Sequence, residues 1–264
     1  MQRVDYLTIA GWGFLLMPLL TMWHEIGGHA AACALQGGHV TTIGAFYVDC
    51  DGLRGVGNII VACAGVFVNA LLAIAVYFAW RKSEKGTARI ILWLIWVSEA
   101  FVASGYFLFS GVTGFGDLGI GEGGSLSTFG LTWPVQVIEI LIGAASYILL
   151  VFAAIRALNT MIGEGPETRR TRRRIAHVYY GSAGVAAVLV GLLNPLGIVI
   201  TVMSAAASSF GGLAGFISVG YAVGDKGEAK PVVLQRNYGV IAAGLVVLLA
   251  FALILGPSLH FPKQ

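Results

Sequence analysis

Two histidines and a glutamate lie close together at the end of an apolar stretch, in the segment His24-Glu25-Ile26-Gly27-Gly28-His29. Imidazole nitrogens are common ligands of Zn²⁺, and a neighbouring carboxylate is suited to accept a proton from metal-bound water. Burying these groups in an apolar segment costs free energy unless a metal ion or water occupies the site. We therefore predict that His24 and His29 bind Zn²⁺ and that Glu25 is the general base. The alternative is that the histidines are unrelated polar residues on opposite sides of a helix end.

The spacing differs by one inserted residue from the common H-E-x-x-H zinc motif. On a regular α-helix, residues five apart point about 140° away from each other, so both imidazoles could not reach one ion. A π-helical bulge absorbs one extra residue, and Gly27-Gly28 makes the distortion cheap because glycine has no Cβ. The sequence therefore predicts a π-bulge here. The H-E-x-x-G-H pattern resembles the zinc helix of dipeptidyl peptidase III over these six residues.

The composition is that of a membrane protein. The chain has 264 residues, of which 57% are hydrophobic and only 11% charged, and its mean hydropathy is +0.83. An apolar run of about 20 residues is long enough to cross a bilayer as a helix. We predict an all-α polytopic membrane protein with six or seven transmembrane helices and a small β-hairpin after the first. The predicted spans are 6–30, 57–80, 90–110, 134–158, 176–193, 196–222 and 238–257.

The fifth and sixth predicted spans are separated only by Asn194-Pro195, so they form either one kinked helix or two packed halves. Residues 1–158 are predicted to be a transmembrane core of four spans that contains the metal site. Residues 159–264 are predicted to add the C-terminal transmembrane helices.

Basic residues are concentrated on one side of the predicted topology. If the spans alternate in direction, fourteen of the sixteen Lys and Arg residues fall at the N-terminus and after spans two, four and six, whereas Arg54 and Lys263 fall on the other side. Basic loops stay in the cytoplasm, so we predict a multi-pass protein of the cell (inner) membrane with a cytoplasmic N-terminus. The basic run at 169–174 then indicates topology or contact with anionic lipid of the bilayer, and not nucleic-acid binding.

Residues 39–56 are predicted to form the β-hairpin. The stretch 39–48 is rich in β-branched and aromatic residues, Asp49–Gly52 is the predicted turn, and Leu53–Val56 is a short returning strand. His39 is a conceivable further metal ligand, but we interpret it as an ordinary polar surface residue.

The three cysteines cannot all pair with one another. Cys33 and Cys63 are predicted to be small apolar packing residues. Cys50 stands between Asp49 and Asp51 in the predicted turn, where it could be exposed.

Gly65 and Asn69 form a G-x-x-x-N pattern in the second predicted span. With the H-E motif in a membrane span and the hairpin after a glycine pair, this pattern resembles the site-2 protease family of intramembrane zinc metalloproteases, with Val66 in place of the usual proline. The resemblance covers the N-terminal third of the chain. It implies a metalloprotease-like core, a Zn²⁺ cofactor, and a role for Asn69 in orienting the substrate backbone or stabilising the oxyanion. It also implies a site that opens toward the cytoplasm, whereas the charge count places the site nearer the other face.

In that family an aspartate from a later span is the third zinc ligand, and the resemblance points to Asp117 in this chain. Asp117 follows the third predicted span in a glycine-rich segment, on the same side of the membrane as His29. Such irregular backbone is tolerated in a membrane only beside protein or a water-filled cavity. The competing ligands are Glu122, Glu99, Asp51 and Asp49.

These observations predict a zinc metalloprotease in which Glu25 assists the attack of zinc-bound water on a peptide bond of a membrane-embedded protein or peptide. The hairpin could pair with an unwound substrate segment by strand addition. One alternative is a zinc amidase or esterase that acts on a lipid or small amphiphile. Another is a non-catalytic binding or transport protein, which the extra residue in the H-E motif favours.

Overall fold

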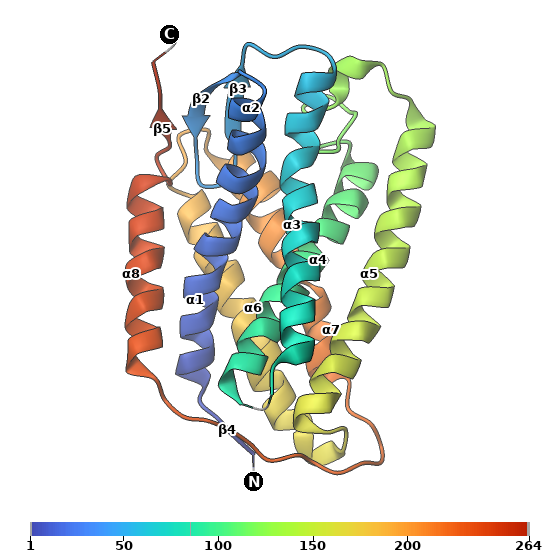
Figure 1. The fold of residues 1–264 in the computed structure, drawn as a ribbon, viewed down its shortest axis with the longest axis vertical. Coiled ribbons are helices and arrows are strands. Elements are labelled where there is room, and N and C mark those ends of the chain that lie inside the picture. The colour runs from blue at the N-terminus through green and yellow to red at the C-terminus, as the bar shows by residue number, and fades with distance from the viewer. Residues whose placement is uncertain (1, 85, 263–264) are drawn as a thin grey trace.

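The computed structural model describes residues 2–84 and 86–262, and Figure 1 shows long helices that run roughly side by side. Within these residues five helical runs are long and apolar enough to cross a membrane. The five are Tyr6–Leu35, Val56–Lys82, Thr87–Thr113, Trp133–Ile162 and Ile200–Tyr221. The prediction of an all-α polytopic membrane protein with a β-hairpin after the first helix is confirmed.

The helices are, in chain order, α1 (Tyr6–Met22), the π-helix η1 (Trp23–Ala30), α2 (Ala31–Leu35), α3 (Val56–Lys82), α4 (Thr87–Thr113), the 3-10 turn η2 (Ser127–Phe129), α5 (Trp133–Ile162), the 3-10 turn η3 (Pro166–Thr168), α6 (Arg169–Gly191), the π-helix η4 (Ile200–Gly211), α7 (Gly215–Tyr221) and α8 (Tyr238–Ile254). The strands are β1 (Gln2–Val4), β2 (His39–Ile43), β3 (Val48–Asp51), β4 (Val232–Leu234) and β5 (Leu259–His260).

The centre of the bundle is aromatic. α4 packs against α3 and α5, α1 packs against α6 and α8, and α6 packs against η4 and α7. The buried ring of Phe216 lies edge to face with Trp93, Phe101 and Tyr179, which come from α4 and α6. Such aromatic pairs contribute about 0.5–1.5 kcal/mol each beyond their buried area. This cluster therefore holds α4, whose C-terminal end leads to Asp117, against α6 and α7.

The fifth and sixth predicted spans form two packed helices and not one kinked helix. α6 ends at Gly191, and the chain turns before η4, which packs back against α6. The buried Asn194 stabilises the turn, because its Oδ1 accepts from the Leu196 N–H at 3.0 Å. α6 also begins before residue 176, where the predicted span starts. The buried Arg172 permits this early start by donating to the Gly163 carbonyl at 2.7 Å.

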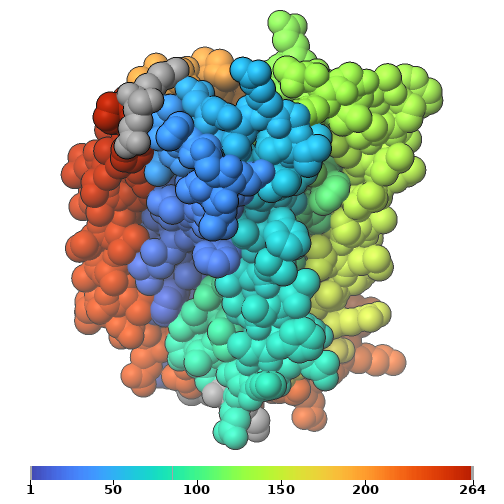
Figure 2. All heavy atoms as spheres, turned by 45° about the horizontal axis from the view of Figure 1, so that its top comes forward, coloured from blue at the N-terminus to red at the C-terminus, as the bar shows by residue number. Residues whose placement is uncertain are grey.

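The hairpin lies beyond the end of the first helix, and Figure 2 shows it beside the start of α3. β2 pairs with β3 and with β5, both antiparallel, so β3 is an edge strand of the three-stranded sheet. The predicted turn at Asp49–Gly52 and the returning strand at Leu53–Val56 are wrong. The chain turns at Gly44, whose N–H donates to the Tyr47 carbonyl at 2.9 Å. A Cβ at Gly44 would lie 2.4 Å from the Tyr47 ring, so glycine here allows that ring to pack against the turn.

Cys33 and Cys50 form a disulfide that joins α2 to β3. The prediction that Cys33 is a free packing residue is therefore wrong. It fails because Cys50 reaches Cys33 only when the chain turns at Gly44, which places Cys50 in β3 and not in a turn. Cys63 is a free thiol that packs beside Val66, as predicted.

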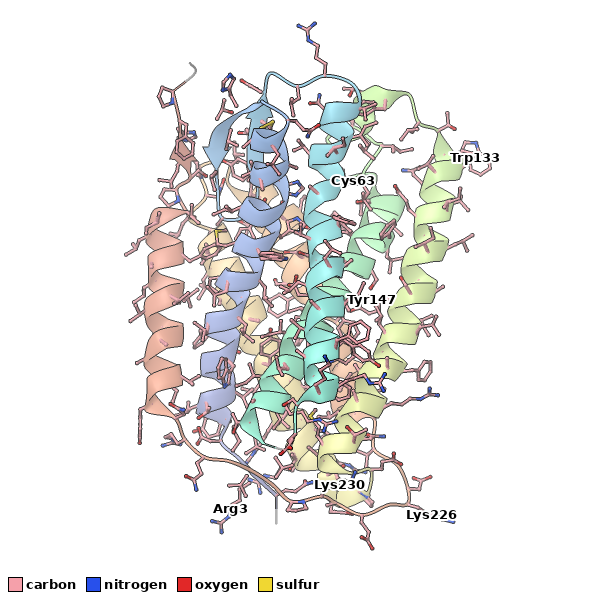
Figure 3. The ribbon with its side chains drawn as sticks, in the orientation of Figure 1. Arg3, Cys63, Trp133, Tyr147, Lys226 and Lys230 are labelled. Atoms are coloured by element: carbon pink, nitrogen blue, oxygen red, sulfur yellow. A yellow bond between two sulfur atoms is a disulfide. The ribbon has the colours of Figure 1, made fainter. Side chains whose placement is uncertain are left out.

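The two ends of the bundle differ in charge. Figure 3 places Arg3, Lys226 and Lys230 at the end that holds the N-terminus, and Trp133 at the opposite end with the hairpin. Basic side chains thus gather at the end opposite the disulfide, as the alternating topology requires.

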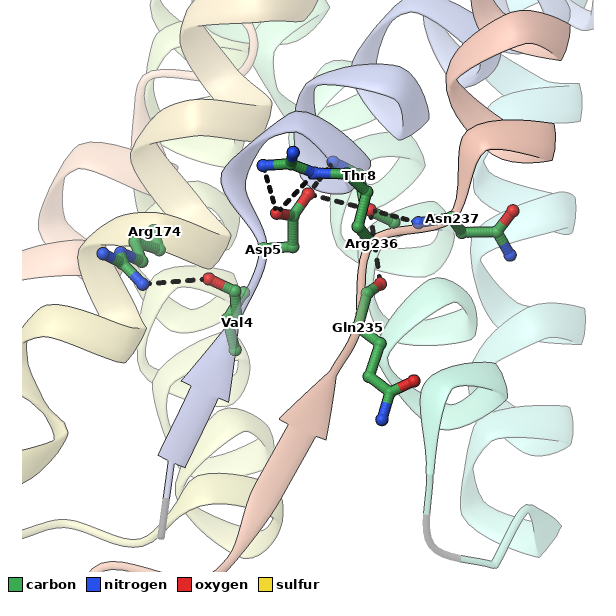
Figure 4. A network of polar contacts seen from close by, with 7 residues as sticks. All are labelled: Val4, Asp5, Thr8, Arg174, Gln235, Arg236 and Asn237. Atoms are coloured by element: carbon green, nitrogen blue, oxygen red, sulfur yellow. Dashed lines mark hydrogen bonds and ion pairs between the residues drawn. The ribbon is translucent and has the colours of Figure 1, made fainter.

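A polar network closes the N-terminal end, where β1 and β4 pair in parallel (Figure 4). Asp5 caps α1 by accepting from the Thr8 N–H at 2.9 Å, and it forms an ion pair with Arg236 at 3.0 Å. Burial raises the pKa of Asp5, but the bonds from Thr8 and Arg236 outweigh burial and lower it. Arg174 of α6 donates to the Val4 carbonyl at 3.0 Å. Segments from both halves of the chain therefore meet here.

Candidate metal centre

His24 and His29 come together because the helix is π-helical over 23–30. Their Nε2 atoms are 3.1 Å apart, and both side chains are buried. The predicted π distortion is confirmed. A Cβ at Gly28 would lie 2.6 Å from the Cα of Gly65, so glycine also allows η1 to approach α3 closely.

Asp117 reaches the same point from the loop after α4. Its Oδ2 lies 3.1 Å from His24 Nε2 and 3.4 Å from His29 Nε2. The loop can turn back because Gly114 and Gly116 adopt left-handed backbone conformations, with φ of 75° and 84°. Burial raises the pKa of the Asp117 carboxyl, but without a metal ion the positive charge of a protonated His29 or His24 outweighs burial and holds that pKa well below its usual value. Asp117 is therefore a carboxylate.

The competing ligands lie elsewhere. Glu122, Asp49 and Asp51 have exposed side chains, as has His39 on β2. Glu99 is buried in α4 and makes no ion pair with a histidine among the described residues. Of the acids considered as third ligand, Asp117 is the one whose carboxylate lies within ion-pair distance of both imidazoles.

Hydrogen bonds behind each imidazole determine which nitrogen carries the proton. His29 Nδ1 donates to the Val61 carbonyl at 2.7 Å, and a carbonyl can only accept. The Asn69 amide satisfies both of its ends when its Oδ1 accepts from His24 Nδ1 at 3.2 Å. In the neutral rings both Nε2 atoms then carry lone pairs. With Asp117 Oδ2, three acceptors lie within 3.4 Å of one another. Acceptors at this distance repel each other, so either a proton or a metal ion must lie between them.

The spacing fits Zn²⁺. Zinc–ligand distances of 2.0–2.2 Å place tetrahedral ligands about 3.3–3.6 Å apart, and the three atoms here are slightly closer, at 3.1–3.4 Å. Gly65 keeps open the space beside the two imidazoles, because a Cβ there would lie 2.5 Å from the Nε2 atoms of both His24 and His29. Glu25 Oε2 is buried without a hydrogen-bond partner among the described residues. The ligand atoms of Glu25 and the two histidines lie within 4.8 Å of one another.

A cavity of about 630 Å³ extends from these residues toward the hairpin. Its walls include Glu25, His29 and Asp117 on one side, Asp49 and Cys50 of β3 on a second, and Ser204 and Ser208 of η4 on a third. A chain in extended conformation is therefore able to approach both β3 and Glu25 from the same space.

Two neighbours of His24 have contacts that the sequence analysis did not predict. Asn69, which the family resemblance places against substrate, lines a small cavity behind His24 and is absent from the walls of the large one. Its contact is with a predicted ligand, so we revise its expected role to support of His24. Tyr106 stacks on the His24 ring with centroids 4.9 Å apart and an interplanar angle of 9°. No sequence signal marks Tyr106, since aromatic residues are common in membrane spans.

Comparison of the chain with protein-family models, with curated proteins and with solved structures finds no match. The candidate site therefore has to be interpreted from its own residues and their geometry.

Proposed function

We propose that this protein is a zinc-dependent intramembrane hydrolase that cleaves peptide bonds. The observation that carries the proposal is the group of three possible ligand atoms, His24 Nε2, His29 Nε2 and Asp117 Oδ2, which face one another within 3.4 Å, a spacing close to that of ligands around Zn²⁺. Beside this group, Glu25 Oε2 is buried and unpartnered among the described residues. Three ligands with a carboxylate beside them are the parts of a zinc hydrolase site.

Zn²⁺ held by His24, His29 and Asp117 would supply a Lewis acid and lower the pKa of a bound water. Glu25 accepts the proton of the attacking water on Oε2 and donates it to the leaving nitrogen. The Val61 carbonyl and Asn69 keep the two imidazoles in the tautomer that presents a lone pair to the ion.

The hairpin supports a peptide as the substrate in preference to a lipid. β3 is the edge strand of its sheet, and residues 48–50 line the large cavity that contains Glu25. An edge strand offers unpaired backbone N–H and C=O groups, with which an extended peptide is able to pair. A lipid ester has no repeating amide groups to match them.

The proposed orientation places the N-terminus in the cytoplasm and the large cavity toward the opposite face. Basic residues such as Arg3, Lys226 and Lys230 lie at the N-terminal end (Figure 3), and basic loops stay cytoplasmic. The Cys33–Cys50 disulfide lies with the hairpin at the other end, and disulfides persist in oxidising compartments. Both observations favour the charge-based orientation over the cytoplasmic opening implied by the site-2 protease resemblance.

The metal is tested first, by measuring the zinc content of purified wild type and of the double variant His24→Ala, His29→Ala. His39→Ala, which removes an exposed histidine from β2, is the matched control. We expect bound zinc in wild type and control and a loss in the double variant. Equal zinc content in all three proteins would remove the metal site and the proposal with it.

The reaction is tested with Glu25→Gln and with two kinds of substrate, membrane-spanning peptides and lipid esters. The variant should keep zinc and lose peptide cleavage. Cleavage of lipids alone would support the amidase or esterase alternative. A wild-type protein that binds zinc and cleaves neither substrate would support a non-catalytic binding or transport protein.

A further inference from the structure

Behind His24, away from the large cavity, Asn69 of α3 and Glu99 of α4 are buried at 1% and 2% exposure. The Asn69 Nδ2 donates to Glu99 Oε2 and to the Gly65 carbonyl, each at 3.2 Å, when its Oδ1 accepts from His24 Nδ1. Three residues from three helices thus form one hydrogen-bonded chain that ends on a predicted zinc ligand.

Glu99 has no part in the steps assigned to Glu25 and the three ligands. Burying a carboxyl inside a membrane-spanning helix nevertheless costs free energy, so the presence of Glu99 needs an explanation. It makes no ion pair among the described residues. It lines a cavity of about 60 Å³ together with Asn69, Glu25 and Ser98. A cavity of this size has room for water, which is able to solvate the carboxyl oxygen that does not bond Asn69.

The Asn69 amide has an acceptor end, Oδ1, and a donor end, Nδ2. The effect of Glu99 follows from which of these ends faces His24. If the Asn69 Nδ2 faced His24, the ring would have to accept at Nδ1 and carry its hydrogen on Nε2, and this nitrogen could not bind a metal. Glu99 accepts a hydrogen bond from Nδ2 and so turns Oδ1 toward His24. We propose that Glu99 is a positioning residue that selects, through Asn69, the metal-binding tautomer of His24. This inference rests on the proposed zinc site.

The test is zinc affinity, measured by competition with a chelator, together with thermal unfolding of the same samples. Glu99→Met and Glu99→Ala should each bind zinc about 10- to 100-fold more weakly, the usual effect of losing a group that orients a ligand. Glu99→Gln retains a carbonyl acceptor and should recover most of the affinity. In an Asn69→Ala background, Glu99→Met should cause no further loss.

Ser98→Ala is the matched control, because Ser98 is the buried neighbour of Glu99 and its hydroxyl bonds the Tyr179 hydroxyl at 2.9 Å. This variant should unfold at a lower temperature and bind zinc like wild type. Wild-type zinc affinity in folded Glu99→Met or Glu99→Ala would overturn the positioning role and leave the zinc site intact. If wild type itself binds no zinc, the proposed function and this inference both fail.

A second site, independent of the first, lies at the start of α6. A surface cavity of about 440 Å³ is lined by Arg169, Arg170, Arg173 and Arg174, with Glu167 and Val178. These four positions span about 140° of the helix and share one face, while Arg172 is buried on the other side. None of the four forms an ion pair among the described residues.

Two of the four arginines are held in place. Arg174 donates to the Val4 carbonyl at 3.0 Å (Figure 4), and the Arg173 guanidinium lies 4.7 Å from the centre of the Tyr221 ring. A guanidinium has five N–H donors, so most of them stay available for an anion. We infer that this cavity binds the phosphate of an anionic phospholipid, whose acyl chain would pack along Val178, one turn further along α6.

The test compares phosphatidylglycerol, phosphatidylcholine and inorganic phosphate as additives to detergent-purified protein during thermal unfolding. Phosphatidylglycerol should raise the Tm of wild type and leave that of the triple variant Arg169→Gln, Arg170→Gln, Arg173→Gln unchanged. Arg81→Gln with Lys82→Gln, basic residues at the end of α3, is the control and should respond like wild type. An equal response of the triple variant would overturn the site, and an equal effect of inorganic phosphate would overturn a lipid as its ligand.

Discussion

Replacing Gly65 by alanine should displace the two imidazoles without removing a ligand. The added Cβ would lie 2.5 Å from the Nε2 atoms of His24 and His29, where ordinary contacts begin at 3.4 Å. The rings must therefore move by about 0.9 Å, well beyond the roughly 0.2 Å tolerance of a metal–ligand distance. Overpacking of this kind costs about 1–3 kcal/mol. Zinc binding must return the displaced rings to the position that clashes, so this free energy opposes binding. Since about 1.4 kcal/mol is a factor of ten, zinc should bind about 5- to 150-fold more weakly.

The assay is chelator competition on purified protein, with Gly181→Ala as the control. Gly181 lies in α6, and a Cβ there would meet no atom within 4 Å. The control should bind zinc like wild type. If Gly65→Ala remains folded and binds zinc with wild-type affinity, the ion does not lie in the space that Gly65 keeps open, and the assigned ligand geometry is refuted.

Three further predictions concern other contacts. Asp117→Asn should weaken zinc binding by about 100-fold or more, because changes behind a ligand alone cost 10- to 100-fold; Glu122→Gln, at an exposed acid, should leave it unchanged in the same competition assay. Replacing Cys33 and Cys50 by serine should lower the Tm, since a disulfide that closes a loop of 17 residues stabilises the folded state by about 3 kcal/mol. A reductant should lower the wild-type Tm and not that of the variant. Asp5→Ala removes the N-cap of α1 and should lower the free energy of unfolding by about 1 kcal/mol at neutral pH, and the Tm with it. Because folding lowers the pKa of Asp5, this difference in Tm should persist above its usual value of 3.8 and vanish as pH falls through the lower folded value.

The π-helix was predictable because the inserted residue and the glycine pair demand the same distortion. His24 and His29 could not share an ion on a regular helix, and Gly27-Gly28 removes the cost of departing from one. Five of the seven predicted spans, those at 6–30, 57–80, 90–110, 134–158 and 196–222, were predictable from apolar length. The early start of α6 was not, because it depends on a buried bond from Arg172 to the Gly163 carbonyl.

Pairings between distant segments were less predictable. Cys50 reaches Cys33 only after the chain turns at Gly44, and β-branched composition alone extended the first strand past that glycine. The sequence marked Glu99 only as a competing metal ligand, since its bond to Asn69 depends on the packing of α3 against α4. Single-residue signals thus identified candidate groups, and tertiary packing determined which of them meet.

The third strand of the hairpin sheet has a consequence for biosynthesis. β5 pairs with β2 through Ile43 and Leu259, and it follows α8 in the chain. During translation the β2–β3 pair therefore emerges long before β5 exists, with one backbone edge of β2 uncovered until the last helix has been inserted. Over that interval the nascent chain has two open edges, and a chaperone or a second nascent chain could occupy either of them.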